Sequence, residues 1–328
     1  MADKRLRLPD SRFGLGLAAL GRPGYINLGH GEDMPGQRDV DAMRRHCHAV
    51  LDAAWERGIR YFDAARSYGR AEAFLGDWLT ARGRRPSDLV VGSKWGYTYT
   101  ADWQVDAEVH EVKSHTREVL DRQWDETRAC LDGHLDLYQI HSATLDSGVL
   151  DNTAVLERLA EIRDGGVAVG LTLSGPKQAE TLRRAMELTV DGQPLFDAVQ
   201  ATWNLLEPSA GEALEAASDS GMAVIIKEGL ANGRLTERND DPEDLGRLVP
   251  LKAAAGGYGC GMDALAMAAI LARPWVDMVL SGAATTDQLE SNLAALRIDL
   301  SEAELRELDA LGEAPETYWA KRGDLEWN

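Results

Sequence analysis

The sequence predicts a single (β/α)8 barrel whose long loops lie over the mouth formed by the carboxyl ends of its strands. Eight short, apolar or β-branched segments alternate with longer amphipathic segments along the 328 residues, which is the pattern of successive strand–helix units. Most connections between the units are short, and no change of composition marks a linker between domains. A doubly wound open sheet shares this alternation, so periodicity alone does not demonstrate that the sheet closes.

The expected domain covers residues 1–328, with terminal extensions over about 1–12 and 312–328. A chain of this length fits one large barrel without a second domain. Hydrophobic residues make up 44% of the chain, which is enough for a large core. The eight expected strands cover residues 13–20, 61–64, 89–93, 135–140, 167–173, 198–203, 223–226 and 278–280.

Each expected strand precedes a segment with the apolar spacing of an amphipathic helix. Gly58, Gly133 and the Gly165–Gly166 pair stand where three of these helices should end, and Pro176 suits a first helical turn. The expected helices cover residues 40–57, 71–82, 114–131, 153–164, 176–188, 208–220, 262–272 and 286–296, with an additional one over 301–311.

Three stretches are too long to be simple turns, namely residues 21–38, 95–113 and 234–262. Long loops in compact domains are usually functional or mobile. The first two follow strands, so in a barrel they lie over the carboxyl-terminal mouth, where barrel enzymes place their sites. Surface decoration is the competing interpretation for each of them.

The chain is strongly acidic, with 54 Asp and Glu against 35 Lys and Arg and a formal charge of −19. Such a surface repels phosphate backbones and anionic lipid headgroups, so we expect neither nucleic acid nor membranes as partners. The first residues lack the pattern of a secretory signal, and no run of about 18 apolar residues occurs, so we expect a cytoplasmic protein. Cys47, Cys130 and Cys260 lack metal-like spacing, so we assign them packing roles and predict no metal site.

Charged or polar side chains end three successive expected strands. Asp63 ends the second strand, Lys94 the third and His141 the fourth, and Tyr68 follows Asp63 on the connecting turn. Because the carboxyl ends of parallel strands meet at one rim of a barrel, we expect these four side chains to lie together. Each of the four could also have an ordinary structural role, such as capping a turn or forming hydrogen bonds within the core. Their joint occurrence at successive strand ends favours a catalytic site.

Such a set supports proton transfer to a carbonyl oxygen while a hydride arrives from elsewhere. The free phenol pKa of about 10 is too high for efficient acid–base work near neutrality unless the ionised form is stabilised. We expect the ammonium of Lys94 beside Tyr68 to provide that stabilisation, and Asp63 to hold the ammonium charged and in position. His141 would donate a hydrogen bond to the substrate oxygen as negative charge develops there.

The segments around these residues resemble the aldo-keto reductase superfamily, a family of (β/α)8 barrels, over almost the whole chain. The similarity is carried by FGLGLAALG at the first strand, GIRYFDAARSYGRAEAFLG around Asp63 and Tyr68, VVGSKWG at Lys94 and LDLYQIHS at His141. The resemblance implies that these four residues are catalytic and that hydride passes between a nicotinamide cofactor and a carbonyl or alcohol. It implies that Tyr68 delivers the proton when aldehydes or ketones are reduced, and removes it in the reverse reaction.

The resemblance also implies a set of cofactor-binding residues, in which several positions depart from the family pattern. Ser174-Gly175 stands where the family usually has Ser-Asn, and Glu228-Gly229-Leu230 where it has Ser-Pro-Leu. Gln200 matches the glutamine that binds the carboxamide, and Trp203 stands where an aromatic ring stacks on the nicotinamide. The implied residues are Gly16, Leu17, Ser174, Gly175, Gln200, Trp203, Lys227, Glu228, Gly229, Leu230, Ser281, Gly282, Ala284, Gln288 and Asn292.

Family precedent favours NADP(H) as the cofactor, with NAD(H) a close alternative. The segment VLSGAATTDQLESNLAAL resembles the family's adenosine-binding loop and helix, yet it contains no Lys or Arg. A 2′-phosphate normally needs a basic partner or several hydrogen-bond donors. Ser281, Thr285 and Thr286 could supply neutral donors, and Lys227 or Arg234 could reach in from outside the segment.

The substrate side of the site is less well defined by the sequence. Aromatic residues cluster in the loop after Lys94 and would form walls suited to sugars, aryl ketones or quinones alike. The expected pocket residues are Trp95, Tyr97, Tyr99, Trp103, His30, Asp33, Trp319 and Trp327. For the last two, docking of the chain terminus onto the barrel is an equal alternative.

We therefore expect an NAD(P)-dependent aldo-keto reductase that acts on a small carbonyl, alcohol or sugar; its oligomeric state stays open. Two alternative functions remain. Some relatives oxidise aldoses to lactones, so an aldose 1-dehydrogenase is one of them. The other is a regulatory barrel that senses the nicotinamide cofactor with little turnover, as the potassium-channel β subunits of this superfamily do.

Overall fold

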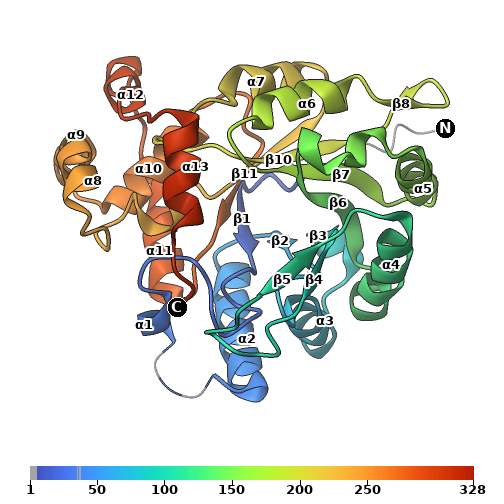
Figure 1. The fold of residues 1–328 in the computed structure, drawn as a ribbon. Coiled ribbons are helices and arrows are strands. Elements are labelled where there is room, and N and C mark those ends of the chain that lie inside the picture. The colour runs from blue at the N-terminus through green and yellow to red at the C-terminus, as the bar shows by residue number, and fades with distance from the viewer. Residues whose placement is uncertain (1–5, 35, 37) are drawn as a thin grey trace.

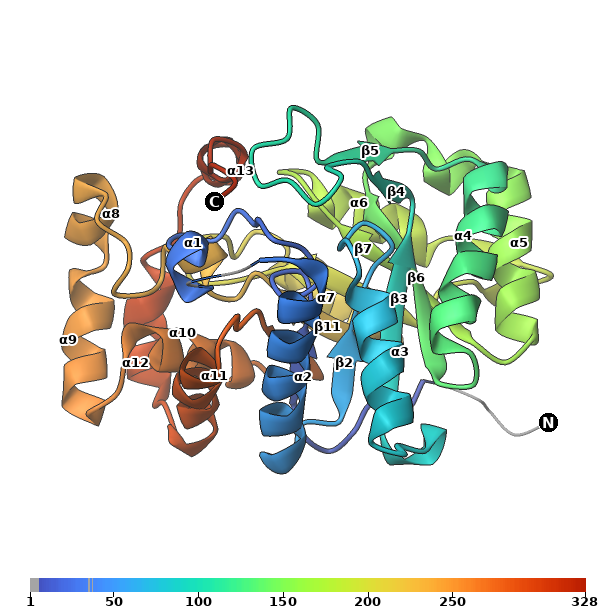
Figure 2. The same cartoon turned by 90° about the horizontal axis from the view of Figure 1, so that it is seen from below.

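The computed structural model describes residues 6–34, 36 and 38–328, and its centre is a closed barrel of eight strands. Around the barrel the strands follow the order β1, β12, β11, β10, β7, β6, β3 and β2, and each neighbouring pair is parallel. Helices surround the strands in both views (Figures 1 and 2). The predicted (β/α)8 barrel is therefore confirmed.

The barrel strands are short, and a helix follows each one along the chain. The strands are β1 (Phe13–Gly16), β2 (Tyr61–Asp63), β3 (Val90–Trp95), β6 (Leu135–Ala143), β7 (Ala168–Leu173), β10 (Ala198–Thr202), β11 (Ala223–Lys227) and β12 (Met278–Ser281). The helices that follow them are α2 (Val40–Glu56), α3 (Ala71–Ala81), α4 (Arg117–Leu131), α5 (Thr153–Asp164), α6 (Gln178–Met186), α7 (Gly211–Asp219), α10 (Met262–Leu271) and α11 (Thr286–Leu293).

Further short elements lie outside these units. Two hairpins are formed by β4 (Tyr97–Tyr99) with β5 (Glu111–Lys113) and by β8 (Thr189–Val190) with β9 (Gln193–Pro194). The additional α-helices are α1 (His30–Asp33), α8 (Pro242–Arg247), α9 (Val249–Tyr258), α12 (Glu302–Asp309) and α13 (Pro315–Gly323). Short 3₁₀ helices cover Pro86–Asp88, Leu145–Ser147, Val149–Asp151, Ala231–Gly233 and Ala294–Arg297.

The expectation that residues 234–262 form a loop is wrong, because α8 and α9 occupy most of that stretch. Pro242 and Pro250 stand in the first turns of these helices, where a missing N–H leaves no hydrogen bond unmade. Leu251 and Ala255 of α9 are buried in a second apolar cluster beside the barrel. That burial stabilises α9 despite its glycines.

Two other boundaries differ from the prediction for local reasons. The strand expected over 13–20 ends at Gly16, because the N–H groups of Leu20 and Gly21 donate to the carbonyl of Leu17 and turn the chain. The loop expected over 95–113 contains the β4–β5 hairpin, so the long stretch without helix or strand is limited to residues 100–110. Both segments still lie at the carboxyl-terminal mouth of the barrel.

Apolar side chains fill the barrel interior toward the amino-terminal ends of the strands, and they fill the layer between strands and helices. Leu6 and Leu8 pack against the interior cluster at the amino-terminal end. The interior cluster consists of Tyr61, Leu137, Ala198, Ile225, Met278 and Leu280. Interior positions nearer the carboxyl ends carry polar side chains instead, among them Asp63, Lys94 and Gln200.

Among the described residues, no single helix is both long and apolar enough to cross a membrane. The consecutive helices α9 and α10 reach that size only when taken together, and the chain bends by 91° between them. Nearly all of α10 is buried within the fold.

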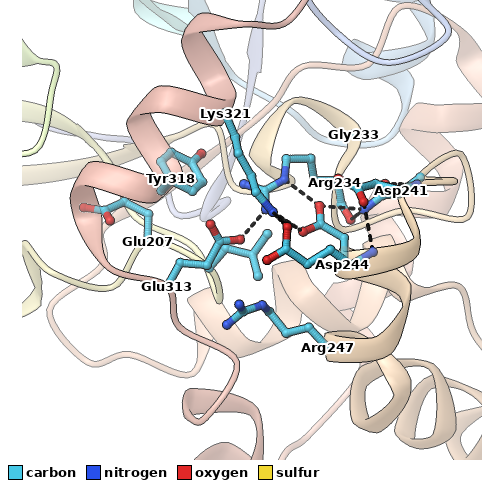
Figure 3. Close-up of polar contacts among 12 residues, drawn as sticks. Glu207, Gly233, Arg234, Asp241, Asp244, Arg247, Glu313, Tyr318 and Lys321 are labelled. Carbon is cyan, nitrogen blue, oxygen red and sulfur yellow. Dashed lines mark hydrogen bonds and ion pairs between the residues drawn. The ribbon is translucent and has the colours of Figure 1, made fainter.

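The segment expected as the C-terminal extension contains α13, which is tied to the barrel by buried ion pairs (Figure 3). Arg234, after β11, donates to Asp244 of α8 at 2.7 and 2.8 Å and also pairs with Glu313 just before α13. Lys321 of α13 donates to the same Asp244 at 3.1 Å. These contacts join α8, the segment after β11 and α13 into one structure.

Candidate active site

A cavity of about 580 Å³ opens at the carboxyl ends of the barrel strands, a size typical of small-molecule sites. Its wall combines the ends of β1, β2, β6, β10, β11 and β12 with the loop after β1, the segment after β11 and the residues that end the chain. Loops that follow strands therefore form the site, as the barrel architecture predicts.

Asp63 and Lys94 form an ion pair inside the barrel, and both side chains are almost completely buried. Alternate residues of a strand face the same side. Asp63 therefore shares the interior face of β2 with Tyr61, and Lys94 shares the interior face of β3 with Gly92. Lys94 also donates to the carbonyl oxygen of Ala64 at 2.9 Å. Asp63 Oδ1 accepts hydrogen bonds from Gln200 Nε2 at 3.1 Å and from the Tyr61 hydroxyl at 3.3 Å. The pair thus has the additional hydrogen bonds that buried charges require.

Tyr68 lies beside this pair, on the turn after β2. The ammonium of Lys94 is 4.9 Å from the centre of the Tyr68 ring. The ring of His141 meets that of Tyr68 edge-on, with ring centres 5.5 Å apart and planes at 84°. Asp63, Tyr68 and His141 line the cavity, and the buried Lys94 lies behind them. The structure therefore brings together the four residues that the strand ends predicted.

The environment of Tyr68 raises its pKa rather than lowering it. Burial is the main cause and the charge of Asp63 adds to it, while the nearby guanidinium of Arg22 acts in the opposite direction. The expected lowering of the Tyr68 pKa by Lys94 is not seen in this arrangement, because the charge of Lys94 is balanced by Asp63 and burial is the larger effect. Tyr68 is consequently a neutral phenol, which is the form that donates a proton.

His141 is held neutral at the same rim. Burial lowers its pKa well below the usual value, and the positive charges of Lys94 and Lys227 lower it further. A neutral imidazole keeps one N–H donor. Its Nδ1 lies 3.4 Å from the hydroxyl of Ser67, and the Tyr97 ring packs against it with centres 4.9 Å apart. These contacts orient the imidazole at the cavity wall.

Most of the residues expected to bind the cofactor line this cavity, and they come from β1, β10, β11, β12 and α11 and the segments that follow these strands. They are Gly16, Gln200, Lys227, Glu228, Gly229, Leu230, Ser281, Gly282, Gln288 and Asn292. The structure places the remaining expected residues outside the lining of the cavity, namely Leu17, Ser174, Gly175, Trp203 and Ala284.

The side chain of Trp203 packs on the outer side of the barrel and does not line the cavity. Gln200 and Thr202 face the interior, where they contact Asp63 and Lys227. The alternation of a strand then directs the next residue, Trp203, to the opposite side. There its indole packs against the ring of Trp275, with centres 5.4 Å apart.

The charge of Glu228 is balanced by a residue from the C-terminal helix. Arg322 of α13 donates three hydrogen bonds of 2.6 to 3.0 Å to the Glu228 carboxylate, and Thr202 donates another at 3.2 Å. Burial opposes the charge of Glu228, but Arg322 and Lys227 outweigh it and lower its pKa to about 2. Sequence reasoning missed Arg322, because it stands 94 residues after Glu228.

Several residues of the cavity lining have the chemistry that binds the parts of a dinucleotide. Lys227 and Arg322 set two cations against the single charge of Glu228, which leaves one positive charge for anionic phosphate groups. Burial lowers the pKa of Lys227 to about 8, so most of it stays protonated at neutral pH. Gly282 leaves open space where a side chain would begin. Gln200, in the middle of β10, lines the cavity with its carboxamide, whose nitrogen donates to Asp63.

Arg234 does not reach the cavity, contrary to one expectation for a 2′-phosphate. Its side chain is 5% exposed and is bonded to Asp244 and Glu313 (Figure 3). Of the neutral donors, Ser281 lines the cavity, whereas the hydroxyl of Thr285 caps α11 by accepting from the backbone N–H of Gln288 at 3.2 Å.

Three of the four tryptophans expected in the substrate pocket, Trp95, Trp103 and Trp319, lie outside the lining of the cavity. Trp95 follows the inward-facing Lys94, so it points outward, is fully buried and packs against the ring of His115. Trp103 packs edge-on against Phe74 of α3. Neither residue lines the cavity.

The other expected pocket residues divide between two environments. His30 is fully buried away from the cavity, and burial lowers its pKa to about 4. Tyr97 and Tyr99 belong to β4, outside the lining. Asp33 and Trp327 do line the cavity.

The wall beside Tyr68 is formed by Arg22, Tyr25, Glu111 and Trp327. Arg22 donates to Glu111 at 3.1 Å. The carbon of its guanidinium lies 4.6, 5.0 and 5.3 Å from the ring centres of Trp327, Tyr25 and Tyr68. Sequence reasoning missed Arg22, Tyr25 and Glu111, because this guanidinium is surrounded by rings from three separate segments of the chain.

The chain thus forms a closed (β/α)8 barrel with a polar cavity at the carboxyl ends of its strands, which is the position of the active site in barrel enzymes. The family model described as the aldo/keto reductase family matches residues 27–313. The chain therefore belongs to the aldo/keto reductase family, as its motifs predicted. Membership supports the oxidoreduction of carbonyl compounds in general.

Individual relatives are distant but cover most of the chain. The protein tas of Escherichia coli K12 is 24% identical over 328 aligned positions, which cover 87% of this chain and 93% of that protein. The pyridoxal 4-dehydrogenase of Microbacterium luteolum is 25% identical over 323 positions, covering 84% and 91%. An aldo-keto reductase from Bacillus halodurans, solved in a holo form, superposes with a TM-score of 0.70 at 21% identity and covers 94% of this chain and 96% of its own. This likeness supports the barrel fold.

Proposed function

We propose that the protein is a nicotinamide-dinucleotide-dependent oxidoreductase that interconverts small aldehydes or ketones and the corresponding alcohols. The observation that carries this proposal is the position of Tyr68 at the cavity wall, next to the buried Lys94–Asp63 pair and the neutral ring of His141. Membership of the aldo/keto reductase family supports the same class of reaction.

In this proposal the bound cofactor supplies a hydride to the carbonyl carbon. Tyr68 transfers its phenolic proton to the carbonyl oxygen, and the N–H of His141 donates a hydrogen bond to that oxygen. The ammonium of Lys94, 4.9 Å from the Tyr68 ring, stabilises the negative charge left on the phenol. Gln200 would hold the carboxamide of the cofactor, and Lys227 would offset the charge of its phosphates.

Oxidation of an aldose is a second candidate reaction. Arg22 and Glu111 line the cavity beside Tyr68 and offer donors and acceptors for sugar hydroxyls. In this direction Tyr68 would have to act as a base in its ionised form. Because burial raises the pKa of Tyr68, the phenol is at neutral pH in the protonated form that reduction requires.

The substitution Tyr68→Phe tests the proposal, because it removes only the proton donor. We expect hydride transfer to a panel of carbonyl compounds to fall by about 100-fold or more, while affinity for the dinucleotide stays unchanged. The rate is followed by the near-ultraviolet absorbance of the reduced nicotinamide. Tyr258→Phe is the matched control, since this tyrosine is 39% exposed and lies outside the cavity lining.

Three outcomes would contradict the proposal in different ways. An unchanged rate in Tyr68→Phe would show that another group donates the proton. A loss of dinucleotide binding in that variant would indicate a structural role for Tyr68. Wild-type protein that binds the dinucleotide but turns over no carbonyl or aldose would favour the regulatory barrel.

A further inference from the structure

We infer that the cavity selects NAD(H) over NADP(H), and that Asp33 sets this selection. The inference rests on the proposed function, because it concerns the end of the same cavity that the adenosine half of the dinucleotide would occupy. That end is formed by the loop after β1, the segment after β11 and the first turn of α11. Figure 1 shows α1, which carries Asp33, beside α11.

Asp33 is built into the wall at this end. It is the last residue of α1, and its side chain is only 6% exposed. Its Oδ2 accepts a hydrogen bond from Gln288 Nε2 at 2.8 Å. Gln288 in turn accepts from the backbone N–H of Ala284 at 2.7 Å, which fixes the amide at the start of α11. Both Asp33 and Gln288 line the cavity.

The cation next to Asp33 is already engaged. Arg238 forms an ion pair with Asp33, and its Nη1 donates to Asp33 Oδ2 at 2.8 Å. The same nitrogen donates to the carbonyl oxygen of Gly29 at 3.0 Å and lies 3.3 Å from that of Leu28. A phosphate at this position would therefore have to compete with a carboxylate for Arg238.

Acidic side chains outnumber basic ones at this end of the cavity. Among the described residues that line it there, Asp33, Glu237, Asp263 and Asp287 are acidic and Arg238 is basic, a formal surplus of three negative charges. A phosphate monoester brings about 1.5 to 2 further negative charges. The resulting like-charge contact is the kind of repulsive element that produces specificity.

The other cations of this region are bonded elsewhere. Arg234 is paired with Asp244 and lies outside the lining of the cavity (Figure 3). Lys227 and Arg322 both lie within salt-bridge distance of Glu228. A 2′-phosphate beside α11 would thus find no unpaired cation among the described residues that line the cavity there.

The same carboxylate suits a ribose that carries no phosphate. An acidic side chain accepts a hydrogen bond from the ribose 2′-hydroxyl in other NAD sites. Replacing that hydroxyl by a phosphate removes the donor and sets two anions against each other. The carboxylate of Asp33 therefore favours the binding of NAD(H) and disfavours the binding of NADP(H).

Titration of the whole protein with NAD⁺ and with NADP⁺, followed by calorimetry or tryptophan fluorescence, measures the selection without turnover. We expect wild-type protein to bind NAD⁺ at least about tenfold more tightly than NADP⁺. Asp33→Asn removes the negative charge, keeps an acceptor oxygen and frees Arg238. The affinity of this variant for NADP⁺ should therefore be about tenfold or more higher than that of wild-type protein. Asp41→Asn is the matched control, because it removes the same charge from an exposed residue of α2 outside the cavity lining.

Adding Arg238→Ala to Asp33→Asn should abolish the gain in NADP⁺ affinity. Equal or tighter binding of NADP⁺ by wild-type protein would overturn the inference and leave the proposed function intact. A ratio that is the same in Asp33→Asn and Asp41→Asn would overturn the role of Asp33. Wild-type protein that binds neither dinucleotide would contradict the proposed function itself. The wild-type titration needs no variant, so it tests the selection even if Asp33→Asn does not fold.

Discussion

Asp63→Asn should lower the free energy of unfolding by about 3–5 kcal/mol, although it hardly changes the shape of the side chain. The size of the effect follows from the surroundings of Lys94. That side chain is completely buried, and its ammonium contacts the carboxylate of Asp63 and the carbonyl of Ala64. In the variant a buried ammonium keeps only neutral acceptors, and an uncompensated buried charge is costly.

Urea-induced unfolding at neutral pH measures this effect, with Asp41→Asn as the control. The Asp41–Arg44 pair is exposed, with side-chain exposures of 68% and 43%, and such surface pairs contribute about 0–1 kcal/mol. The double variant Asp63→Asn/Lys94→Met should lose less stability than the two single variants combined, because it removes the charge together with its partner. A cost for Asp63→Asn no larger than that of Asp41→Asn would refute the reasoning.

Two further predictions concern residues around the cavity. Because the pKa of Glu228 is lowered from 4.5 to about 2, Glu228 should stabilise the fold above about pH 4.5 and lose that contribution as the pH falls toward 2. Urea unfolding across this window should show a weaker pH dependence in Glu228→Gln than in wild type, and identical curves would argue against the Arg322 pair. Trp203→Ala should cost about 3–5 kcal/mol of stability but leave dinucleotide affinity unchanged, since the indole packs on Trp275 outside the barrel. A loss of affinity in the folded variant, measured by the same titration, would show that Trp203 takes part in dinucleotide binding.

Much of the fold could be predicted from the sequence, because the apolar spacing that distinguishes strands from helices is a local property. All eight strand–helix units were found at the predicted places. The helices α8 and α9 were missed, because prolines and glycines weaken their local signal. Their stability depends on contacts such as those of Leu251, which packs in a cluster with residues far away in the chain.

Part of the site could be predicted for a similar reason. Asp63 and Lys94 lie at or near the carboxyl ends of their strands, and the architecture of a barrel brings such positions together. The sequence did not show where the side chain of Trp203 would lie. Trp203 directly follows β10, and its odd spacing from Gln200 directs the two side chains to opposite sides. The pKa of Tyr68 also differed from expectation, because a pKa depends on the sum of burial and all nearby charges.

The sequence by itself determined the strand–helix order of the barrel and the common rim of Asp63, Tyr68, Lys94 and His141. Only the tertiary structure decided which distant residues complete the cavity. Arg322 reaches Glu228 across 94 positions, and Asp33 meets Gln288 across 255. Such contacts arise when the barrel closes and α13 docks, and no local periodicity encodes them. Their physical consequence is the charge of the cavity wall, on which the proposed choice between NAD(H) and NADP(H) depends.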